Sequence, residues 1–157
     1  MELQIKKISI IFCTSFGIGY LTKFPGTLAS LIILPIIWYL KITFNFLTLL
    51  NLLLIFIFFS FIFVKISINN TKNKDPNYII IDEYIGQFVT LLFCEQTIIN
   101  FFLGFILFRF FDIFKPFPIN YFDKLNNAFG LIMDDIVAGL FAAFFIYIII
   151  NLIQIFS

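Results

Sequence analysis

The fold is decided by the stretch NFLTLLNLLLIFIFFSFIFV, residues 45–64, which contains no charged side chain. A helix needs about 20 apolar residues to cross a bilayer, so this stretch predicts a transmembrane helix. The whole chain of 157 residues is 62% hydrophobic and only 12% charged. Soluble domains carry about 25% charged residues. Lipid is therefore the expected solvent for much of the protein surface.

Working outward, further apolar segments run over residues 8–21, 28–40, 84–94, 97–111 and 135–156. Segment 135–156 is long enough to span, and segment 28–40 is short but could extend at either end. Segments 84–94 and 97–111 are too short for ordinary spans. They predict a tight hairpin of tilted or shallow helices, or helices that extend through Asp82 and Phe114. Segment 8–21 is interrupted by Gly17 and Gly19, which suggests an interfacial or re-entrant piece.

These segments predict an all-α fold, a polytopic integral membrane bundle with short or re-entrant helices. The length suits one membrane-embedded domain over residues 1–157. The apolar N-terminal stretch lacks a small-x-small cleavage site and is expected to stay in the mature chain.

The composition excludes several functions. The net charge of +1 gives no reason to expect a nucleic-acid partner. Cys13 and Cys94 lie far apart, without metal-ligand spacing, and suggest no disulfide. The chain has no histidine, which removes imidazole zinc sites and histidine-activated nucleophiles. Any catalysis must therefore rest on carboxylates, Lys, Arg, hydroxyls and a metal.

Following the segments across the bilayer places most charges at one end of the bundle, which we call side A. Basic residues mark the cytoplasmic face in short loops. Two charged residues are expected on the opposite side, side B: the basic Lys41 and the acidic Glu95. Side A is therefore expected to be cytoplasmic, and it holds the basic residues Lys23, Lys65, Lys72, Lys74, Arg109, Lys115 and Lys124.

Acidic residues open or interrupt apolar helices at three places on side A. These are Asp82 and Glu83 in IIIDEYIG, Asp112 in FRFFDIFKP, and Asp134 and Asp135 in LIMDDIVAG. Ionisable residues in apolar segments are functional candidates, and carboxylate oxygens are ligands that Mg²⁺ prefers. The alternative is helix capping, since Asp82 and Asp134 sit where caps would sit. One cap is enough for each helix, so the second acid of each doublet lacks that explanation.

Two further motifs suit phosphate binding. Arg109, Asp112 and Lys115 recur every three residues, which places them on one helix face, either as an intrahelical ion pair or as a site that holds metal and phosphate together. Thr27 is the expected cap of the helix after Lys23-Phe24-Pro25-Gly26, where free N–H groups and the hydroxyls of Thr27 and Ser30 could also bind phosphate. Asp75, Asp123 and Lys124 are most simply solvated.

From the residues alone, three classes of function stay open. A metal-dependent enzyme would gather the acids on one face. A small transporter or channel for protons or cations would spread them through the membrane depth. A structural membrane subunit would use the acids as caps and partner contacts, and would tolerate the loss of Glu83 or Asp135.

Four ordered blocks of the chain resemble the phosphatidylglycerophosphatase A family: GIGYLTKFPGTLASL (17–31), DPNYIIIDEYIGQFVTL (75–91), FRFFDIFKPFPINYFD (108–123) and GLIMDDIVAG (130–139). The resemblance implies a bacterial inner-membrane enzyme of phosphatidylglycerol synthesis. That enzyme would use Mg²⁺ to hydrolyse phosphatidylglycerophosphate to phosphatidylglycerol and inorganic phosphate. It also implies roles for site residues. The metal-binding and catalytic acids would be Asp82, Glu83, Asp134 and Asp135, with Asp112 a further catalytic acid, and the phosphate would be held by Arg109, Lys115, Thr27 and Ser30.

Overall fold

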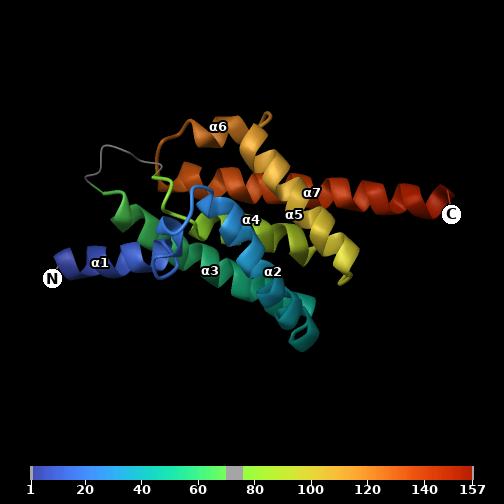
Figure 1. The fold of residues 1–157 in the computed structure, drawn as a ribbon, viewed down its shortest axis with the longest axis horizontal. Coiled ribbons are helices and arrows are strands. Elements are labelled where there is room, and N and C mark those ends of the chain that lie inside the picture. The colour runs from blue at the N-terminus through green and yellow to red at the C-terminus, as the bar shows by residue number, and fades with distance from the viewer. Residues whose placement is uncertain (1, 70–75, 157) are drawn as a thin grey trace.

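The computed structural model describes residues 2–69 and 76–156, and these form helices joined by short connections (Figure 1). Asp75 and two of the side A lysines, Lys72 and Lys74, lie outside the described residues. The elements in chain order are α1 (Glu2–Cys13), the 3-10 helix η1 (Ile18–Tyr20), α2 (Pro25–Thr43), α3 (Phe46–Ser67), α4 (Ile81–Leu92), α5 (Ile98–Phe114), α6 (Ile119–Asp123) and α7 (Ala128–Phe156). The predicted all-α fold is confirmed for the described part of the chain.

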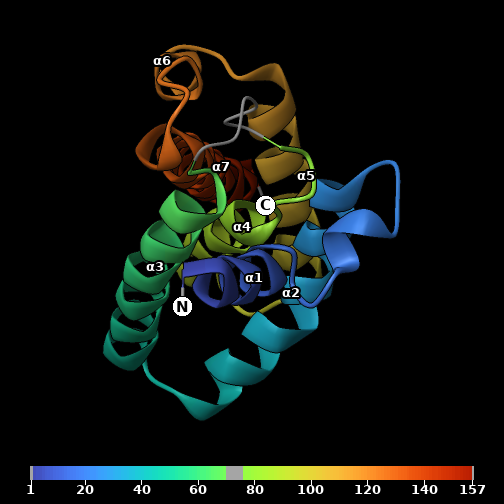
Figure 2. The same cartoon turned by 90° about the vertical axis from the view of Figure 1, so that its left-hand side faces the viewer.

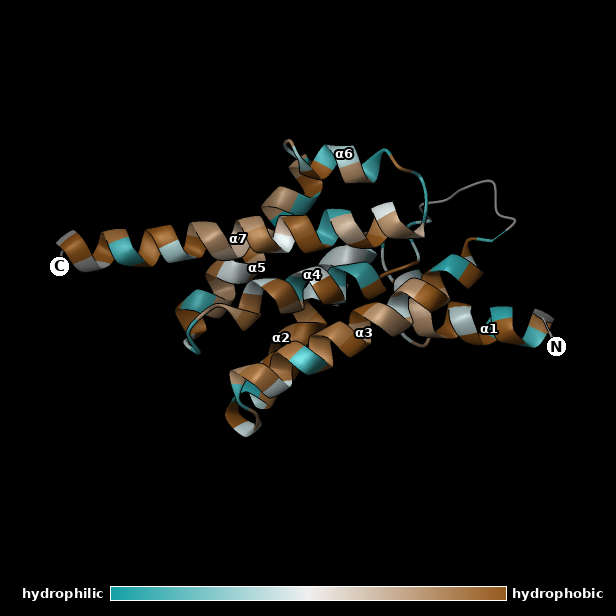
Figure 3. Ribbon diagram, turned by 180° about the vertical axis from the view of Figure 1, so that it is seen from behind, coloured by the Kyte–Doolittle hydropathy of each residue, from teal (hydrophilic) through white to brown (hydrophobic). Residues whose placement is uncertain are grey.

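Within the described residues, three helices are long and apolar enough to cross a bilayer, namely α2, α3 and residues 128–153 of α7. Segment 45–64 forms α3 as predicted, and segment 28–40 extends at both ends to become α2. Figure 3 shows most of α3 and α7 in the colour of hydrophobic residues. Many of these side chains face outward, including Leu47 and Phe58, which are 65% and 62% exposed. An outer surface of this kind fits a lipid environment.

The centre of the bundle is occupied by α4, which the other helices surround (Figure 2). It packs against α2, α3, α5 and α7, and every residue from Ile81 to Leu92 except Glu83 is buried. Its contact with α7 is close because glycine meets glycine there. A Cβ atom at Gly139 would lie 2.4 Å from the carbonyl oxygen of Gly86. Small residues allow such backbone approach between membrane helices.

The short apolar segments form an α4–α5 hairpin, and both helices include the residues named as possible extensions, Asp82 and Phe114. Lys41, near the end of α2, donates hydrogen bonds to the carbonyls of Leu91, at 2.8 Å, and Cys94. Leu91 lies in the last turn of α4, and Cys94 lies just beyond the end of the helix. Lys41 therefore fixes the C-terminal end of α4. It thereby also fixes the position of Asp82 and Glu83 at the N-terminal end.

Segment 8–21 forms no helix long enough to be a candidate membrane span. α1 has 12 residues, which rise roughly 18 Å, and the chain then turns through Ser15, Phe16 and Gly17 with positive φ angles. α1 packs along α3, and the Cys13 carbonyl accepts a hydrogen bond of 2.9 Å from the Ile80 N–H. The N-terminal segment thereby anchors the stretch that leads into α4.

Candidate active site

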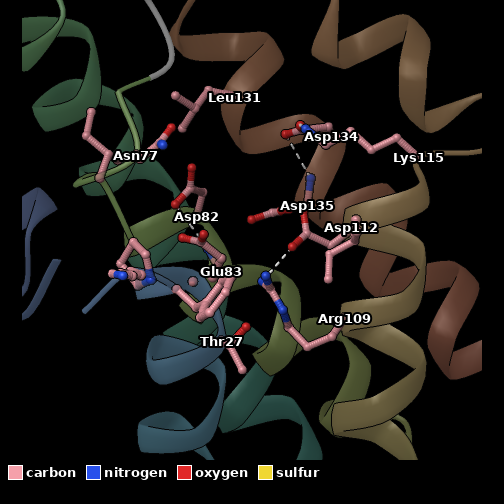
Figure 4. A pocket seen from close by; sticks show the side chains of 16 residues that line it. Thr27, Asn77, Asp82, Glu83, Arg109, Asp112, Lys115, Leu131, Asp134 and Asp135 are labelled. Carbon is pink, nitrogen blue, oxygen red and sulfur yellow. Dashed lines mark hydrogen bonds and ion pairs between the residues drawn. The ribbon is translucent and has the colours of Figure 1, made fainter.

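The predicted site residues converge on a cavity of about 380 Å³ at the side A end of the bundle. It lies among the N-termini of α2 and α4, the C-terminus of α5 and the second and third turns of α7 (Figure 4). The cavity is lined by all five predicted acids, Asp82, Glu83, Asp112, Asp134 and Asp135, and by Arg109, Lys115 and Thr27. The structure therefore brings these eight predicted residues together at one end of the bundle. The acids are not spread through the depth of the bundle, as a transport path would require.

Three of the acids form a compact cluster. Asp82 and Glu83 of α4 and Asp135 of α7 each offer a carboxylate oxygen, and these oxygens lie within 4.8 Å of one another. Asp82 and Asp135 are buried, at 7% and 4% exposed, and Glu83 Oε2 has no hydrogen-bond partner among the described residues. Figure 4 shows the three side chains pointing toward the same space. Closely spaced buried carboxylates repel one another unless a cation or protons neutralise them.

The surroundings of Asp82 and Glu83 on α4 also favour either protonation or a bound cation. α4 lies outside the three spanning helices, and its first turn is enclosed by the bundle. Burial raises the pKa of Asp82 well above its ordinary range, and the neighbouring Glu83 carboxylate adds to the effect. Burial also raises the pKa of Glu83, to about 7. A bound cation would oppose both shifts, because it favours the charged carboxylates.

Helix capping does not explain these acids. α7 begins at Ala128, and the Asn127 side chain accepts a hydrogen bond of 2.9 Å from the Gly130 N–H in the manner of a cap. The sequence had suggested that Asp134 and Asp135 open the last helix. They lie instead in its second and third turns. In α4 the cap position is Ile80, and Asp82 lies two residues into the helix. The expectation that Asp82 and Asp134 occupy cap positions was wrong.

Arg109 and Asp112 form the predicted intrahelical pair. Arg109 Nη1 lies 2.5 Å from Asp112 Oδ2, and the two side chains are only 15% and 13% exposed. Arg109 Nε has no hydrogen-bond partner among the described residues. Arg109 and Glu83 also share a close neighbour, since a Cβ atom at Gly26 would lie 3.0 Å from Arg109 Nη1 and 2.1 Å from Glu83 Oε1. The Arg109 guanidinium therefore lies beside the acid cluster and has an N–H donor that no described residue accepts.

Lys115 follows α5 as its C-cap in a left-handed conformation, with φ of 43°, so it leaves the helical stripe that its spacing had suggested. Its Nζ lies 2.7 Å from Asp134 Oδ2 and also pairs with Asp123. Burial alone would lower the pKa of Lys115, but Asp134 and Asp123 outweigh it and raise that pKa above its ordinary value. Asp134 is therefore paired with the Lys115 ammonium group and is not part of the three-acid cluster. Asp123, expected to be solvated, is half-exposed and paired.

The start of α2 closes one side of the cavity. α2 begins at Pro25 and its cap position is Phe24, so Thr27 is not the cap that the sequence suggested but lies in the first turn and lines the cavity. The first turn leaves the N–H groups of Gly26 and Thr27 without helical acceptors. Ser30 is not brought to the cavity. It is fully buried, and its hydroxyl donates to the Gly26 carbonyl at 2.8 Å.

Sequence reasoning missed two polar residues that line the cavity, Lys23 and Asn77. Lys23 was counted only as a side A charge. Asn77 lies before α4, two residues after Asp75, which was expected to be solvated. The one signal that could have found them is their position inside the two sequence blocks that carry Thr27 and Asp82.

Fold and site together define a class, a helical membrane protein with a polar cavity at one end that combines a carboxylate cluster with separate basic side chains. Oxygen ligands of this kind suit a hard cation, and Arg and Lys suit phosphate. The sequence matches the family Phosphatidylglycerophosphatase A over residues 11–150, and the chain belongs to that family.

Relatives named Phosphatidylglycerophosphatase A support the same assignment. The one from Haemophilus influenzae is 34% identical, over 92% of this chain and 93% of the relative. The one from Escherichia coli is 32% identical, over 88% of this chain and 81% of the relative. A Bacteroides thetaiotaomicron protein named Putative phosphatidylinositol-3-phosphatase is 28% identical, over 86% of this chain and 89% of the relative. No solved structure gives a significant match.

Proposed function

We propose that this protein is a Mg²⁺-dependent lipid phosphatase that converts phosphatidylglycerophosphate to phosphatidylglycerol and inorganic phosphate. In this role it would serve phosphatidylglycerol synthesis in a bacterial inner membrane. Membership of the family and the names of the two relatives above 30% identity support the substrate. The observation that carries the chemistry is the meeting of Asp82, Glu83 and Asp135 in one cavity with Arg109 and Lys115.

The residues present fit a divalent cation. The three-acid cluster offers oxygen donors and no sulfur or imidazole, and Glu83 Oε2 is buried without a partner among the described residues. Hard oxygen donors of this kind favour Mg²⁺ over zinc. Asp82, Glu83 and Asp135 would hold the ion, and Asp134 would act through its pair with Lys115. When bound, the ion would supply positive charge that stabilises phosphate oxygens in the transition state.

The remaining side chains can position and activate the reactants. Arg109 and Lys115 would bind the oxygens of the terminal phosphate, assisted by the Thr27 hydroxyl and the free N–H groups of the first turn of α2. Asp112 would accept a proton from water as the water oxygen bonds to phosphorus. The bond from phosphorus to the glycerol oxygen would break, and that oxygen would take up the proton held by Asp112 to give the product hydroxyl.

The same proposal places the cavity on the cytoplasmic face. Lys23, Lys115 and Lys124 lie at the cavity end of the bundle, and Lys65 lies in the last turn of α3. Lys41 lies at the other end, near the last turn of α4. Basic residues concentrate on the cytoplasmic side of membrane proteins, so this asymmetry favours a cytoplasmic site.

The test is phosphate release from phosphatidylglycerophosphate by the purified protein in detergent, with Mg²⁺ and with EDTA. The parent should release phosphate only with Mg²⁺. Asp135→Asn should reduce the rate by about 100-fold or more, because it removes one charge from the three-acid cluster. Glu95→Gln is the matched control, since Glu95 lies on the turn between α4 and α5, away from the cavity, and it should keep the parent rate.

Other results would point elsewhere. A folded parent that releases no phosphate would refute the substrate assignment. Full activity in Asp135→Asn would leave the phosphatase but remove this acid from its site. Phosphatidylinositol 3-phosphate belongs in the same assay, because one relative is named for that substrate. Faster release from it would move the substrate assignment to that lipid.

A further inference from the structure

A second, apolar cavity of about 360 Å³ lies between α2 and α5 and is lined by Leu34, Pro35, Trp38, Ile98, Phe101 and Phe102. We call it the α2–α5 groove. Phe101 forms its floor, being 5% exposed and stacked edge-on against Trp38 at 4.9 Å between ring centroids. Ile98 and Phe102 at its rim are 79% and 61% exposed. The groove is therefore a surface depression with a buried floor, and it faces the surroundings of the bundle.

The two helices that form the groove also form one wall of the site cavity. Thr27 of α2 and Arg109 of α5 face each other at the same end of the cavity in Figure 4. The cavity is also lined by two exposed apolar residues, Phe24 just before α2 and Ile113 of α5, which are 75% and 65% exposed. The polar cavity therefore has an apolar rim on the same pair of helices that carries the groove below it.

The spacing along the two helices matches. α2 runs away from the cavity and α5 runs toward it, so distances can be counted from Thr27 on one and from Arg109 on the other. Leu34 and Phe102 are each seven residues from these points, and Trp38 and Ile98 are each eleven residues away. At 1.5 Å per residue these steps correspond to roughly 10 and 16 Å. Half of a bilayer's hydrocarbon core is about 15 Å, so these lengths are within the reach of an acyl chain whose phosphate occupies the cavity.

From this geometry we infer that the α2–α5 groove holds an acyl chain of the lipid substrate while its phosphate occupies the site cavity. The inference rests on the proposed function and adds to it the path of the lipid, which would enter sideways from the leaflet past Phe24 and Ile113. Lipid tails gain little from moving between bilayer and protein. The groove would therefore orient the substrate more than hold it tightly, and would favour chains long enough to reach Leu34 and Phe102.

The bundle offers a matched comparison. A groove of about 330 Å³ between α3 and α7 is equally apolar and includes Leu54 and Ile136. It lies on the other face of α7 from Asp134 and Asp135, which face the site cavity. A substrate whose phosphate is in the cavity cannot place a chain there without passing around α7. Filling this groove should leave the reaction unchanged.

The experiment compares phosphate release from phosphatidylglycerophosphate with long acyl chains and with dihexanoyl chains, which are too short to fill the groove. Leu34→Trp should lower kcat/KM for the long-chain lipid by about tenfold and leave kcat/KM for the dihexanoyl lipid unchanged. Phe102→Ala changes an exposed side chain and spares the core, so it should lower the long-chain kcat/KM by a smaller factor. Leu54→Trp should leave kcat/KM unchanged for both lipids.

Equal effects of Leu34→Trp on both lipids, or no effect on either, would overturn the inference. So would a long-chain defect in Leu54→Trp as large as that in Leu34→Trp. If Leu34→Trp does not fold, Phe102→Ala decides in the same way, because only loss confined to the long-chain lipid supports the groove. A folded parent that hydrolyses neither lipid would be a different result, since it refutes the proposed function itself.

Discussion

At the scale of single residues, the site divides its acids by their partners. Asp112 is paired with Arg109 and Asp134 with Lys115, at 2.5 and 2.7 Å. Asp82, Glu83 and Asp135 meet without an ion pair among the described residues. Paired carboxylates are already stabilised as anions, whereas the unpaired cluster gains most from a cation. The arrangement explains why five acids in one cavity need not share one role.

Gly26 gives a residue-scale prediction because it is the nearest neighbour of this cluster on α2. A Cβ atom there would lie 2.1 Å from Glu83 Oε1, so Gly26→Ala must push the Glu83 carboxylate aside. The helix itself should persist, since alanine favours helices. We expect the Mg²⁺ concentration for half-maximal phosphate release to rise by about tenfold, as for changes that disturb the setting of a metal ligand.

A Mg²⁺ titration of phosphate release checks this expectation. The double variant Gly26→Ala with Glu83→Asp should recover part of the Mg²⁺ affinity, because the shorter carboxylate avoids the new methyl group. Ala29→Gly, a change in the next turn of α2 away from the cavity lining, is the control. An unchanged titration in Gly26→Ala would show that Glu83 Oε1 does not hold the ion.

At the scale of elements, α4 is the helix on which the site depends. It is too short to span, yet it is buried by four neighbouring helices and carries two acids of the cluster at its N-terminus. Its C-terminus is held by Lys41, and its contact with α7 is fixed by the approach of Gly139 to Gly86. The position of Asp82 and Glu83 relative to Asp135 therefore follows from contacts at the middle and at the C-terminal end of α4.

Lys41 supplies the element-scale prediction. Lys41→Met should remove the hydrogen bonds to the carbonyls of Leu91 and Cys94 and cost about 1–3 kcal/mol in the free energy of unfolding, because charged donors make strong bonds. Thermal unfolding in detergent should show a lower Tm, while the Mg²⁺ dependence of the remaining folded enzyme stays that of the parent. Lys124→Met, in the exposed connection after α6, should leave Tm unchanged. A normal Tm in Lys41→Met would mean that these bonds do not stabilise α4.

At the scale of the whole molecule, polar chemistry is confined to one end of an apolar bundle. The exposed surface of the three spanning helices is largely apolar, and the cavity opens near their side A ends. Such a protein can act on a headgroup at the membrane surface while the acyl chains stay in apolar surroundings. The fixed orientation of the bundle then decides which compartment supplies water and receives phosphate.

Cysteine labelling tests that orientation. Glu95→Cys lies on side B and Lys124→Cys on side A, whereas the native Cys13 and Cys94 are buried and give the background. In intact spheroplasts, a membrane-impermeant maleimide should label Glu95→Cys at once and Lys124→Cys only after permeabilisation. The reverse pattern would place the cavity outside the cytoplasm and contradict the charge asymmetry on which the proposal rests.

The sequence by itself determined the expected lipid surroundings, the helical class and most of the charged residues that line the cavity. Uncharged runs such as 45–64 permit few structures other than a membrane helix, because lipid leaves backbone groups no partner outside the helix. Acids are rare in such a chain, so the unusual positions of Glu83 and Asp135 were visible without coordinates. The same reasoning failed at helix starts, where Asp134 and Thr27 were taken as caps, since local preferences do not reveal that a helix begins a turn or two earlier.

Only the tertiary structure decided which of these residues meet. Nothing in the local pattern of 109–115 indicates that Lys115 leaves its helix to pair with Asp134, or that Asp123 joins it. Ser30 and Thr27 look alike in sequence, yet one turns to the Gly26 carbonyl and the other lines the cavity. The physical reason is that a metal or phosphate site is made by contacts between helices far apart in the chain. Those contacts are set by packing, such as the approach of Gly86 to Gly139, which no local propensity encodes.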